Sequence, residues 1–146
     1  MKRIAFIMAV TLLTGAIVAH GRMRVNPDED AIRQTVEMYF DALMQGDGEL
    51  LKQAFDDQAV LMASRDAEIM RLPFADWVEG FQGNAKENPE TYTNQIVSID
   101  VYGTAASVKT DLQWPEVHYV DYLSLLKVGG EWKVVNKIFV GEEPTS

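Results

Sequence analysis

Residues 117–140 read VHYVDYLSLLKVGGEWKVVNKIFV, two runs in which apolar residues recur at every second position around Gly129 and Gly130. A period of two is typical of β-strands that bury one face, and two adjacent glycines are typical of a tight hairpin turn. The stretch therefore predicts an antiparallel hairpin, with strands from about Val117 to Val128 and from Trp132 to Val140.

Two further strands are predicted immediately before this hairpin. The first carries Val97, Ile99 and Val101 in alternation and ends at Gly103. The second ends at Pro115, which cannot continue a hydrogen-bonded ladder. Its expected inward face consists of Ala106, Val108, Thr110, Leu112 and Trp114. The chain from Tyr92 onward is therefore expected to form four strands joined by tight turns.

The first half of the chain has helical periodicity instead. Apolar residues recur at intervals of three and four between Asn26, a favourable N-cap, and Gly46, which suits the end of a helix. Two shorter helices are expected after Asp47 and from Pro73, with a strand over residues 59–63 between them. Helices followed by antiparallel strands are typical of the α+β class.

The N-terminus predicts a cleavable signal peptide. Lys2 and Arg3 precede an uncharged, mostly apolar run that is shorter than the roughly 20 residues of a membrane-spanning helix. Cleavage would release a secreted protein without membrane association, into the periplasm if the signal is bacterial. The predicted organisation is a signal peptide over residues 1–21, a short linker over 22–27, one domain over 28–140 and an acidic tail over 141–146.

Composition and charge exclude several classes of protein. A chain of 146 residues with 47% apolar residues is long enough for one domain with a sizeable core and too short for two. The lack of cysteine excludes disulfide scaffolds, thiolate metal sites and cysteine nucleophiles. The net charge is -9, and it becomes -11 without the predicted signal peptide, which leaves 11 basic against 22 acidic residues. This acidic balance argues against a nucleic-acid partner.

Three segments of the chain carry a family resemblance: Tyr39–Leu43 followed by Gly46 and Asp47, Ala54–Ala59, and Asp121–Phe139. They resemble the nuclear transport factor 2-like (NTF2-like) superfamily over residues 28–140, and the closing segment is most similar to its putative lumazine-binding family. The resemblance implies a cone-shaped α+β barrel, with about three N-terminal helices packed in a curved, mostly antiparallel sheet and an apolar pocket at the open end. The superfamily includes SnoaL-like and ketosteroid isomerase-like enzymes, ligand binders and interaction modules, so the fold alone does not define a function.

Two polar residues fall on the predicted inward faces of the last two strands. Asp121 is in phase with Tyr119, and Asn136 is in phase with Val134, so both side chains are expected to point into the cone. Tyr39 lies in the apolar stripe of the first helix, which should bring its hydroxyl to the same interior. Two interpretations stay open: Asp121 accepts hydrogen bonds from Tyr39 or Asn136 as a structural group, or it acts as an acid toward a ligand.

These polar groups and nearby aromatic side chains predict a site for a small molecule. Trp77 on a short helix and Trp114 at the end of a strand are expected near the mouth of the pocket. No spacing of His, Asp or Glu indicates a metal site, and no motif indicates a cofactor. The predicted ligand-binding residues are Tyr39, Trp77, Trp114, Tyr119, Asp121 and Asn136.

Non-catalytic binding of a small apolar or heterocyclic molecule is the favoured function. The alternative is a dehydratase, isomerase or cyclase that uses Asp121 and Tyr39, the two residues that the resemblance aligns with the oxygen-binding pair of the ketosteroid isomerase branch. Ala63 stands where that branch has its general base, so Asp66 or His118 would have to face inward and replace it. A second alternative is an interaction module that forms a homodimer through the outer face of the sheet.

Overall fold

The computed structural model describes residues 26–81 and 83–143. The predicted signal peptide, residues 22–25 of the predicted linker and residues 144–146 of the predicted tail lie outside the described residues. None of the helices in the described part is long and apolar enough to cross a membrane.

Three helices and six strands confirm the predicted α+β class. Two helices precede the first two strands, the third helix follows them, and the last four strands follow one another along the chain. A single turn of 3-10 helix at Pro89–Thr91 leads into the third strand. The elements are α1 (Pro27–Gln45), α2 (Gly48–Ala54), β1 (Phe55–Arg65), β2 (Glu68–Pro73), α3 (Phe74–Phe81), β3 (Thr93–Tyr102), β4 (Ala105–Gln113), β5 (His118–Val128) and β6 (Glu131–Glu142).

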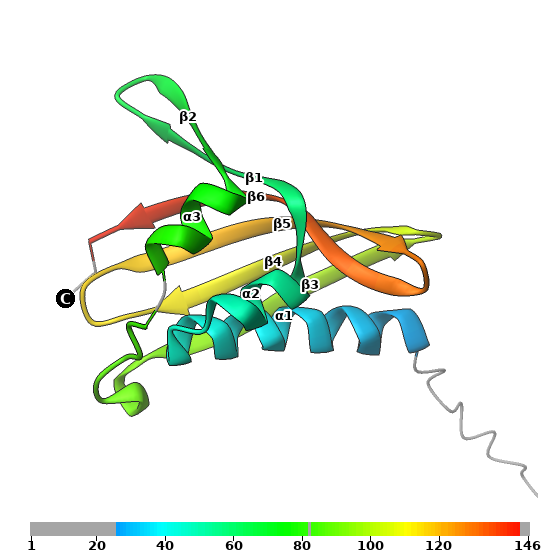
Figure 1. Cartoon of the computed structure of the whole chain (residues 1–146), viewed down its shortest axis with the longest axis horizontal. Helices are drawn as coiled ribbons and strands as arrows, with labels where there is room; N and C mark the ends of the chain where they lie inside the picture. Colours follow the sequence, from blue (N-terminus) through cyan, green and yellow to red (C-terminus); the bar gives the residue numbers. More distant parts are fainter. Residues whose placement is uncertain (1–25, 82, 144–146) are drawn as a thin grey trace, which may run out of the picture.

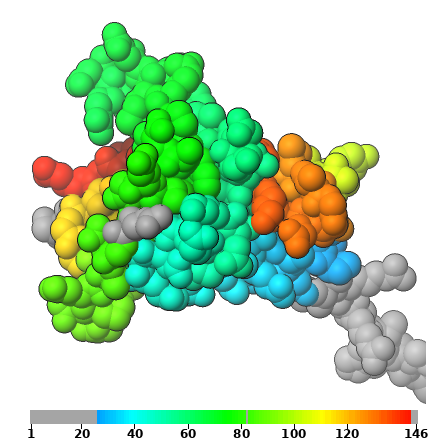
Figure 2. Space-filling model, viewed as in Figure 1, coloured from blue at the N-terminus to red at the C-terminus, as the bar shows by residue number. Residues whose placement is uncertain are grey.

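The six strands form one sheet in the order β2-β1-β6-β5-β4-β3. Neighbouring strands are antiparallel except β1 and β6, which run parallel, so the sheet is mixed. Figure 1 shows the three helices on one face of this sheet and the β1–β2 hairpin projecting beyond the body of the domain. In the space-filling view, α2 and α3 cover the centre of the helical side (Figure 2). The core therefore lies between the helices and the inner face of the sheet.

The β1–β2 hairpin is the main element that the sequence pattern did not predict. β1 extends over Phe55–Arg65 rather than 59–63, and β2 follows it directly. The two-residue turn consists of Asp66 and Ala67, both with positive φ. Turns of this kind favour asparagine, aspartate or glycine, so Asp66 suits the turn, but Ala67 does not, and the pair is a weak turn signal. β2 is also largely exposed and lacks the buried face that produces apolar alternation.

A β-bulge in β6 changes which residues of that strand face the core. Asn136 pairs with Ser124 of β5, and Val134 pairs with the next residue, so Val135 is an extra residue. The pairing with β1 is interrupted at the same place. Because a bulge shifts the alternation by one residue, Val134 faces inward before it and Lys137 faces inward after it. The predicted inward orientation of Asn136 is therefore wrong.

A second bulge affects β3. Its pairing with β4 shifts between Ile96 and Ser98, which leaves Val97 as the extra residue. Val97 is exposed, while Ile99 and Val101 pack against the core as predicted.

The start of α1 is attached to the β5–β6 hairpin by polar contacts. Asp28 Oδ1 accepts hydrogen bonds from Lys127 Nζ at 2.6 Å and from Trp132 Nε1 at 3.2 Å. These donors hold the pKa of the Asp28 carboxyl below its usual value, the bond from Lys127 having the larger effect. Thr35 Oγ1 donates to the backbone oxygen of Trp132. The contacts fix α1 along the sheet, with Tyr39 buried against it.

Candidate functional site

A partly open cavity of about 190 Å³ lies between α1, α3, β2 and the inner face of the sheet. The space corresponds to about six water molecules at about 30 Å³ each. Pockets for drug-sized ligands are larger, about 300–1,000 Å³. Its lining is mostly aliphatic and aromatic: Tyr39, Leu43, Leu61, Leu72, Trp77, Phe81, Leu112, Trp114, Tyr119, Lys137 and Phe139. The cavity suits a molecule of one or two rings.

Three polar side chains meet at one wall of this cavity. Lys137 Nζ donates to the hydroxyl oxygen of Tyr39 at 2.6 Å and lies 3.2 Å from Asp121 Oδ2. The Tyr39 hydroxyl donates in turn to Asp121 Oδ2 at 2.8 Å. Tyr39 and Asp121 are fully buried, and Lys137 is 7% exposed. Lys137 and Tyr39 line the cavity, whereas Asp121 lies behind them.

Burial changes the acid–base properties of this triad. It raises the pKa of the Tyr39 hydroxyl well above its ordinary value, and the neighbouring Asp121 carboxylate adds to that rise. Burial lowers the pKa of the Lys137 ammonium, while the charge and hydrogen bond of Asp121 oppose part of the change. Tyr39 therefore remains a hydroxyl donor, and Lys137 gives up its proton more readily than an exposed lysine does.

Aromatic rings surround the amino group of Lys137. Its Nζ lies 5.1 Å from the ring centroid of Tyr39, 5.5 Å from that of Trp77 and 5.0 Å from that of Phe139. Ring faces attract a cation at such distances. The same rings form the apolar wall against which a ligand would pack.

The triad has unused hydrogen-bonding capacity. A lysine ammonium carries three protons. Within the described residues Lys137 Nζ has two oxygen partners, Tyr39 and Asp121, which leaves one proton for an acceptor in the cavity. Asp121 Oδ1 and Thr110 Oγ1 occupy directly paired positions of β5 and β4, and neither atom bonds to another described residue. Asp121 and Thr110 lie behind the lining, so the group that can bond to a molecule in the cavity is the Lys137 ammonium, which can donate one further hydrogen bond.

The structure brings four of the six predicted binding residues to the cavity lining: Tyr39, Trp77, Trp114 and Tyr119. Asp121 contacts the lining through Tyr39 and Lys137, which agrees with the interpretation that Tyr39 donates to it. Whether these residues bind a ligand stays a prediction.

Asn136 does not join this group. Its amide nitrogen donates to the backbone oxygen of Val60 at 2.9 Å, so it links β6 to β1 instead of lining the cavity. The inward position belongs to the next residue, Lys137, which a regular alternation with Asn136 inward would place on the opposite face. A regular strand pattern carries no signal for the bulge at Val135 that exchanges the two residues.

Neither of the two residues that could replace the missing base, Asp66 and His118, lines the interior cavity. Asp66 is exposed in the turn of the projecting β1–β2 hairpin. His118 Nε2 lies 3.1 Å from Asp111 Oδ2, and His118 does not line the cavity. Neither residue therefore supplies the inward-facing base that the isomerase alternative requires, and Ala63 does not line the cavity either.

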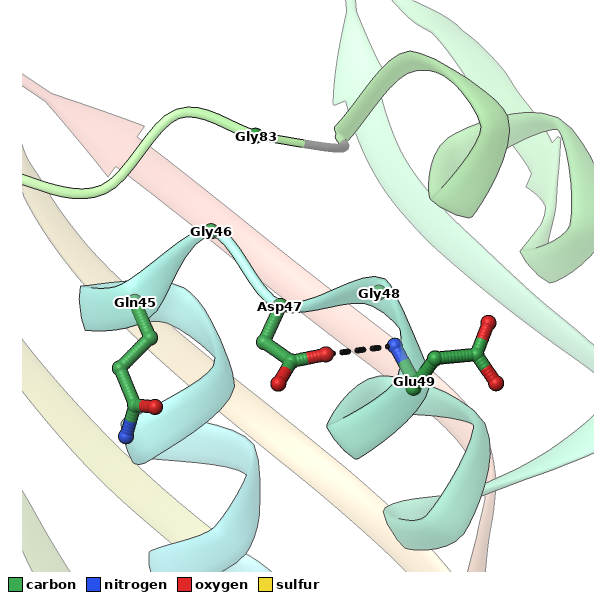
Figure 3. A pocket seen from close by; sticks show the side chains of 6 residues that line it. All are labelled: Gln45, Gly46, Asp47, Gly48, Glu49 and Gly83. Atoms are coloured by element: carbon green, nitrogen blue, oxygen red, sulfur yellow. Dashed lines mark hydrogen bonds between the residues drawn. The ribbon is translucent and has the colours of Figure 1, made fainter.

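A second hollow lies on the surface where α1 meets α2 (Figure 3). Asp47 Oδ1 accepts from the backbone nitrogens of Glu49 at 2.8 Å and Leu50 at 3.2 Å, so this carboxylate caps α2 as predicted. No cluster of three His, Asp or Glu side chains within residues 26–81 and 83–143 is placed to hold a metal ion. The hollow is therefore best explained as a helix junction. It is lined by Gln45, Gly46, Asp47, Gly48, Glu49 and Gly83.

Comparisons with known proteins agree with this architecture. The family described as putative lumazine-binding matches residues 27–140. An NTF2-like protein of unknown function from Shewanella baltica OS155 is 27% identical, with a TM-score of 0.73 and coverage of 82% of this chain and 96% of that chain. Another from Methylobacillus flagellatus KT is 26% identical, with a TM-score of 0.70 and the same coverage. Aldolase FrzH from Cladobotryum sp is 28% identical over 112 residues, which are 75% of this chain and 88% of that protein.

Proposed function

The chain belongs to the putative lumazine-binding family of NTF2-like proteins, and we propose that its cavity binds one small, flat molecule with an apolar body and a hydrogen-bond acceptor. The observation that carries this proposal is the amino group of Lys137 at the wall of an otherwise apolar, aromatic cavity. Such pockets bind through apolar contact and orient the ligand with a few placed polar groups. A ring carbonyl or ring nitrogen would accept the remaining proton of Lys137.

The cavity size narrows the ligand class. A volume of about 190 Å³ is below the range of about 300–1,000 Å³ for drug-sized ligands, which favours one ring or two fused rings over a steroid-sized molecule. Trp77 and Trp114 provide flat surfaces on which such rings can pack. A pteridine dione such as lumazine has both the flat shape and the carbonyl acceptors.

Filling the cavity is expected to weaken binding. Leu72→Trp places a larger side chain at the cavity wall and should weaken the binding of lumazine by about tenfold or more, or about 1.4 kcal/mol. Isothermal titration calorimetry measures this change. Val128→Trp is the matched control, because Val128 is 61% exposed on the far β5–β6 turn and should leave the affinity unchanged. Equal affinities of wild type and Leu72→Trp would contradict the proposed site.

A second candidate function is catalysis on a carbonyl compound in the same cavity. The name of the relative Aldolase FrzH denotes an enzyme of carbonyl chemistry, and it is 28% identical over 88% of that protein. The triad of Tyr39, Lys137 and Asp121 offers linked proton donors and acceptors for such a reaction. A dehydratase, isomerase or cyclase that uses Asp121 and Tyr39 would have to work through this triad, because Asp121 lies behind the cavity wall.

We also propose that the outer face of the sheet mediates a homodimer. Tyr122 of β5 pairs with Ile138 of β6, and Val120 pairs with Val140 beside them. Tyr122, Ile138 and Val140 are each about half exposed, at 51%, 49% and 51%. Adjacent apolar side chains of this kind are typical of protein contact surfaces.

Ile138→Lys is expected to convert a dimer into a monomer, because the dimer would have to bury the new ammonium group without a partner. Light scattering after size-exclusion chromatography measures the mass. Val97→Lys is the control, since Val97 is similarly exposed but lies on the edge strand β3. A wild-type protein that stays monomeric at every concentration would rule out this interface.

A further inference from the structure

We propose that the amino group of Lys137 is a nucleophile that forms an imine with a small aldehyde or ketone bound in the cavity. The inference rests on the proposed binding of a small molecule in that cavity, and it adds a covalent bond at one named atom. It assigns to Lys137 a reactivity that the exposed lysines of the chain do not share.

The position of Lys137 separates it from these other lysines. Its side chain is 9% exposed and lines the cavity, so a carbonyl compound in the cavity would lie next to it. The side chains of Lys52, Lys127 and Lys133 are 50%, 33% and 26% exposed and form ion pairs at the surface. Limited access of water at Lys137 also protects an imine from hydrolysis.

Tyr39 and Asp121 complete a path for the proton that an imine-forming lysine must release. Lys137 Nζ donates to the Tyr39 oxygen at 2.6 Å, and the Tyr39 hydroxyl donates to Asp121 Oδ2 at 2.8 Å. A proton can therefore pass from nitrogen to carboxylate through one hydroxyl. Burial supports the same step, since it lowers the pKa of the Lys137 ammonium and so favours the free amine.

The reaction balances within this triad. The Lys137 ammonium transfers one proton through Tyr39 to Asp121, and the free amine adds to the carbonyl carbon. A carbon–nitrogen bond forms while the carbonyl π electrons move to oxygen, which receives one of the two remaining nitrogen protons. Asp121 returns its proton through Tyr39 to that oxygen, the carbon–oxygen bond breaks, and water leaves. The product is an iminium ion with the same positive charge as the original ammonium.

The surroundings of Lys137 stabilise this product and define the substrate class. The iminium charge would lie close to the Asp121 carboxylate and the rings of Tyr39, Trp77 and Phe139, as the ammonium charge does now. Lys137 is the one cationic residue among the described residues that line the cavity, and it is paired with Asp121. The expected substrate is therefore an uncharged aromatic or cyclic aldehyde or ketone.

Reductive trapping tests this proposal on the full chain. The protein is incubated at neutral pH with benzaldehyde and sodium cyanoborohydride, which reduces an imine to a stable secondary amine. Peptide mass spectrometry then measures labelling at each lysine over time. We expect Lys137 to be labelled at least about tenfold faster than Lys127 and Lys133, because burial and proton transfer each favour its reaction.

Two variants retain Lys137, so the test does not depend on replacing this buried residue, which could itself impair folding. Leu72→Trp retains the lysine but fills the cavity, and it should remove the fast labelling. Tyr39→Phe removes the hydroxyl that relays the proton and leaves only the longer contact of 3.2 Å between Lys137 Nζ and Asp121 Oδ2. It should slow the labelling of Lys137 by about 100-fold, the lower end of the range for general acid–base catalysis. Labelling of the exposed lysines should stay the same in both variants.

The outcomes separate this proposal from the binding proposal. If lumazine binds but Lys137 is labelled no faster than the exposed lysines, the imine proposal fails and the binding proposal stands. If neither lumazine binding nor fast labelling is observed, both fail. Fast labelling of Lys137 that persists in Leu72→Trp would also overturn the assignment, because the aldehyde would then reach the lysine by another route.

Discussion

Asp121→Asn is expected to lower the free energy of unfolding by about 3–5 kcal/mol, because it leaves the Lys137 ammonium buried without a charged partner. Asp121 is fully buried, and its Oδ2 lies 3.2 Å from Lys137 Nζ. Asparagine keeps the shape of the side chain and an oxygen that can accept from the Tyr39 hydroxyl. The substitution therefore removes the charge and little else.

Urea unfolding of wild type and variant measures this effect, and a surface pair provides the control. Lys52 Nζ lies 2.7 Å from Glu49 Oε1, a shorter contact than the buried one, but both side chains are exposed. Exposed pairs contribute about 0–1 kcal/mol, so Glu49→Gln should change the stability little. A loss of less than about 1 kcal/mol in Asp121→Asn would contradict the claim that burial makes this pair important.

A double variant separates the cost of an unpaired charge from the value of the pair itself. In Asp121→Leu with Lys137→Met no buried charge remains, and replacing buried ion pairs by apolar residues is often neutral or stabilising by about 1–4 kcal/mol. The double variant is therefore expected to be more stable than Asp121→Asn. It should also lose the fast reductive labelling, because the lysine is gone.

Gly46→Ala is expected to destabilise the protein by about 2–5 kcal/mol for two separate reasons. Gly46 ends α1 with a φ of 65°, and an L-residue in this left-handed region costs about 1–2 kcal/mol. In addition, a Cβ at this position would lie 2.5 Å from the backbone nitrogen and carbonyl carbon of Asn84, and overpacking costs about 1–3 kcal/mol. Because the contact is with backbone, a change of side-chain rotamer cannot relieve it.

Gly129→Ala separates these two contributions. Gly129 has a similar φ of 61°, but no atom lies within 4 Å of a Cβ built there, so only the backbone cost of about 1–2 kcal/mol is expected. Thermal and urea unfolding of the two variants measure the difference. Equal losses would mean that the loop at Asn84 moves aside, and that the hydrogen bond from Gly83 N to Gly46 O does not hold it in place.

The buried triad is difficult to explain by stability alone. A buried ion pair is weak support for a fold, since apolar residues of similar size usually serve as well. Here the pair lies at the wall of the apolar cavity, with Lys137 presented to it and Asp121 behind. That arrangement is what a binding or reactive amine requires, and it links the stability prediction for Asp121 to the proposed chemistry of Lys137.

Local sequence patterns determined much of the architecture. The cap at Asn26, the glycine at Gly46 and the cap at Asp47 define the helix ends in the structure as predicted. The alternating residues and the turn at Gly129 and Gly130 define the strands β5 and β6. These features depend on residues near one another in the chain, so backbone conformation and periodicity are enough to reveal them. The same patterns correctly placed Tyr39 and Asp121 in the interior, where they bond to each other.

Only the tertiary structure decided which residue of β6 faces the cavity. The alternation predicted Asn136, but β6 pairs with β5 on one side and β1 on the other, and both pairings shift at Val135. That bulge depends on how three strands from distant parts of the chain align, so no local pattern in β6 reveals it. The bulge moves the inward-facing position along β6 by one residue. Asn136 therefore points toward β1, and the amino group of Lys137 lies beside Tyr39 and Asp121.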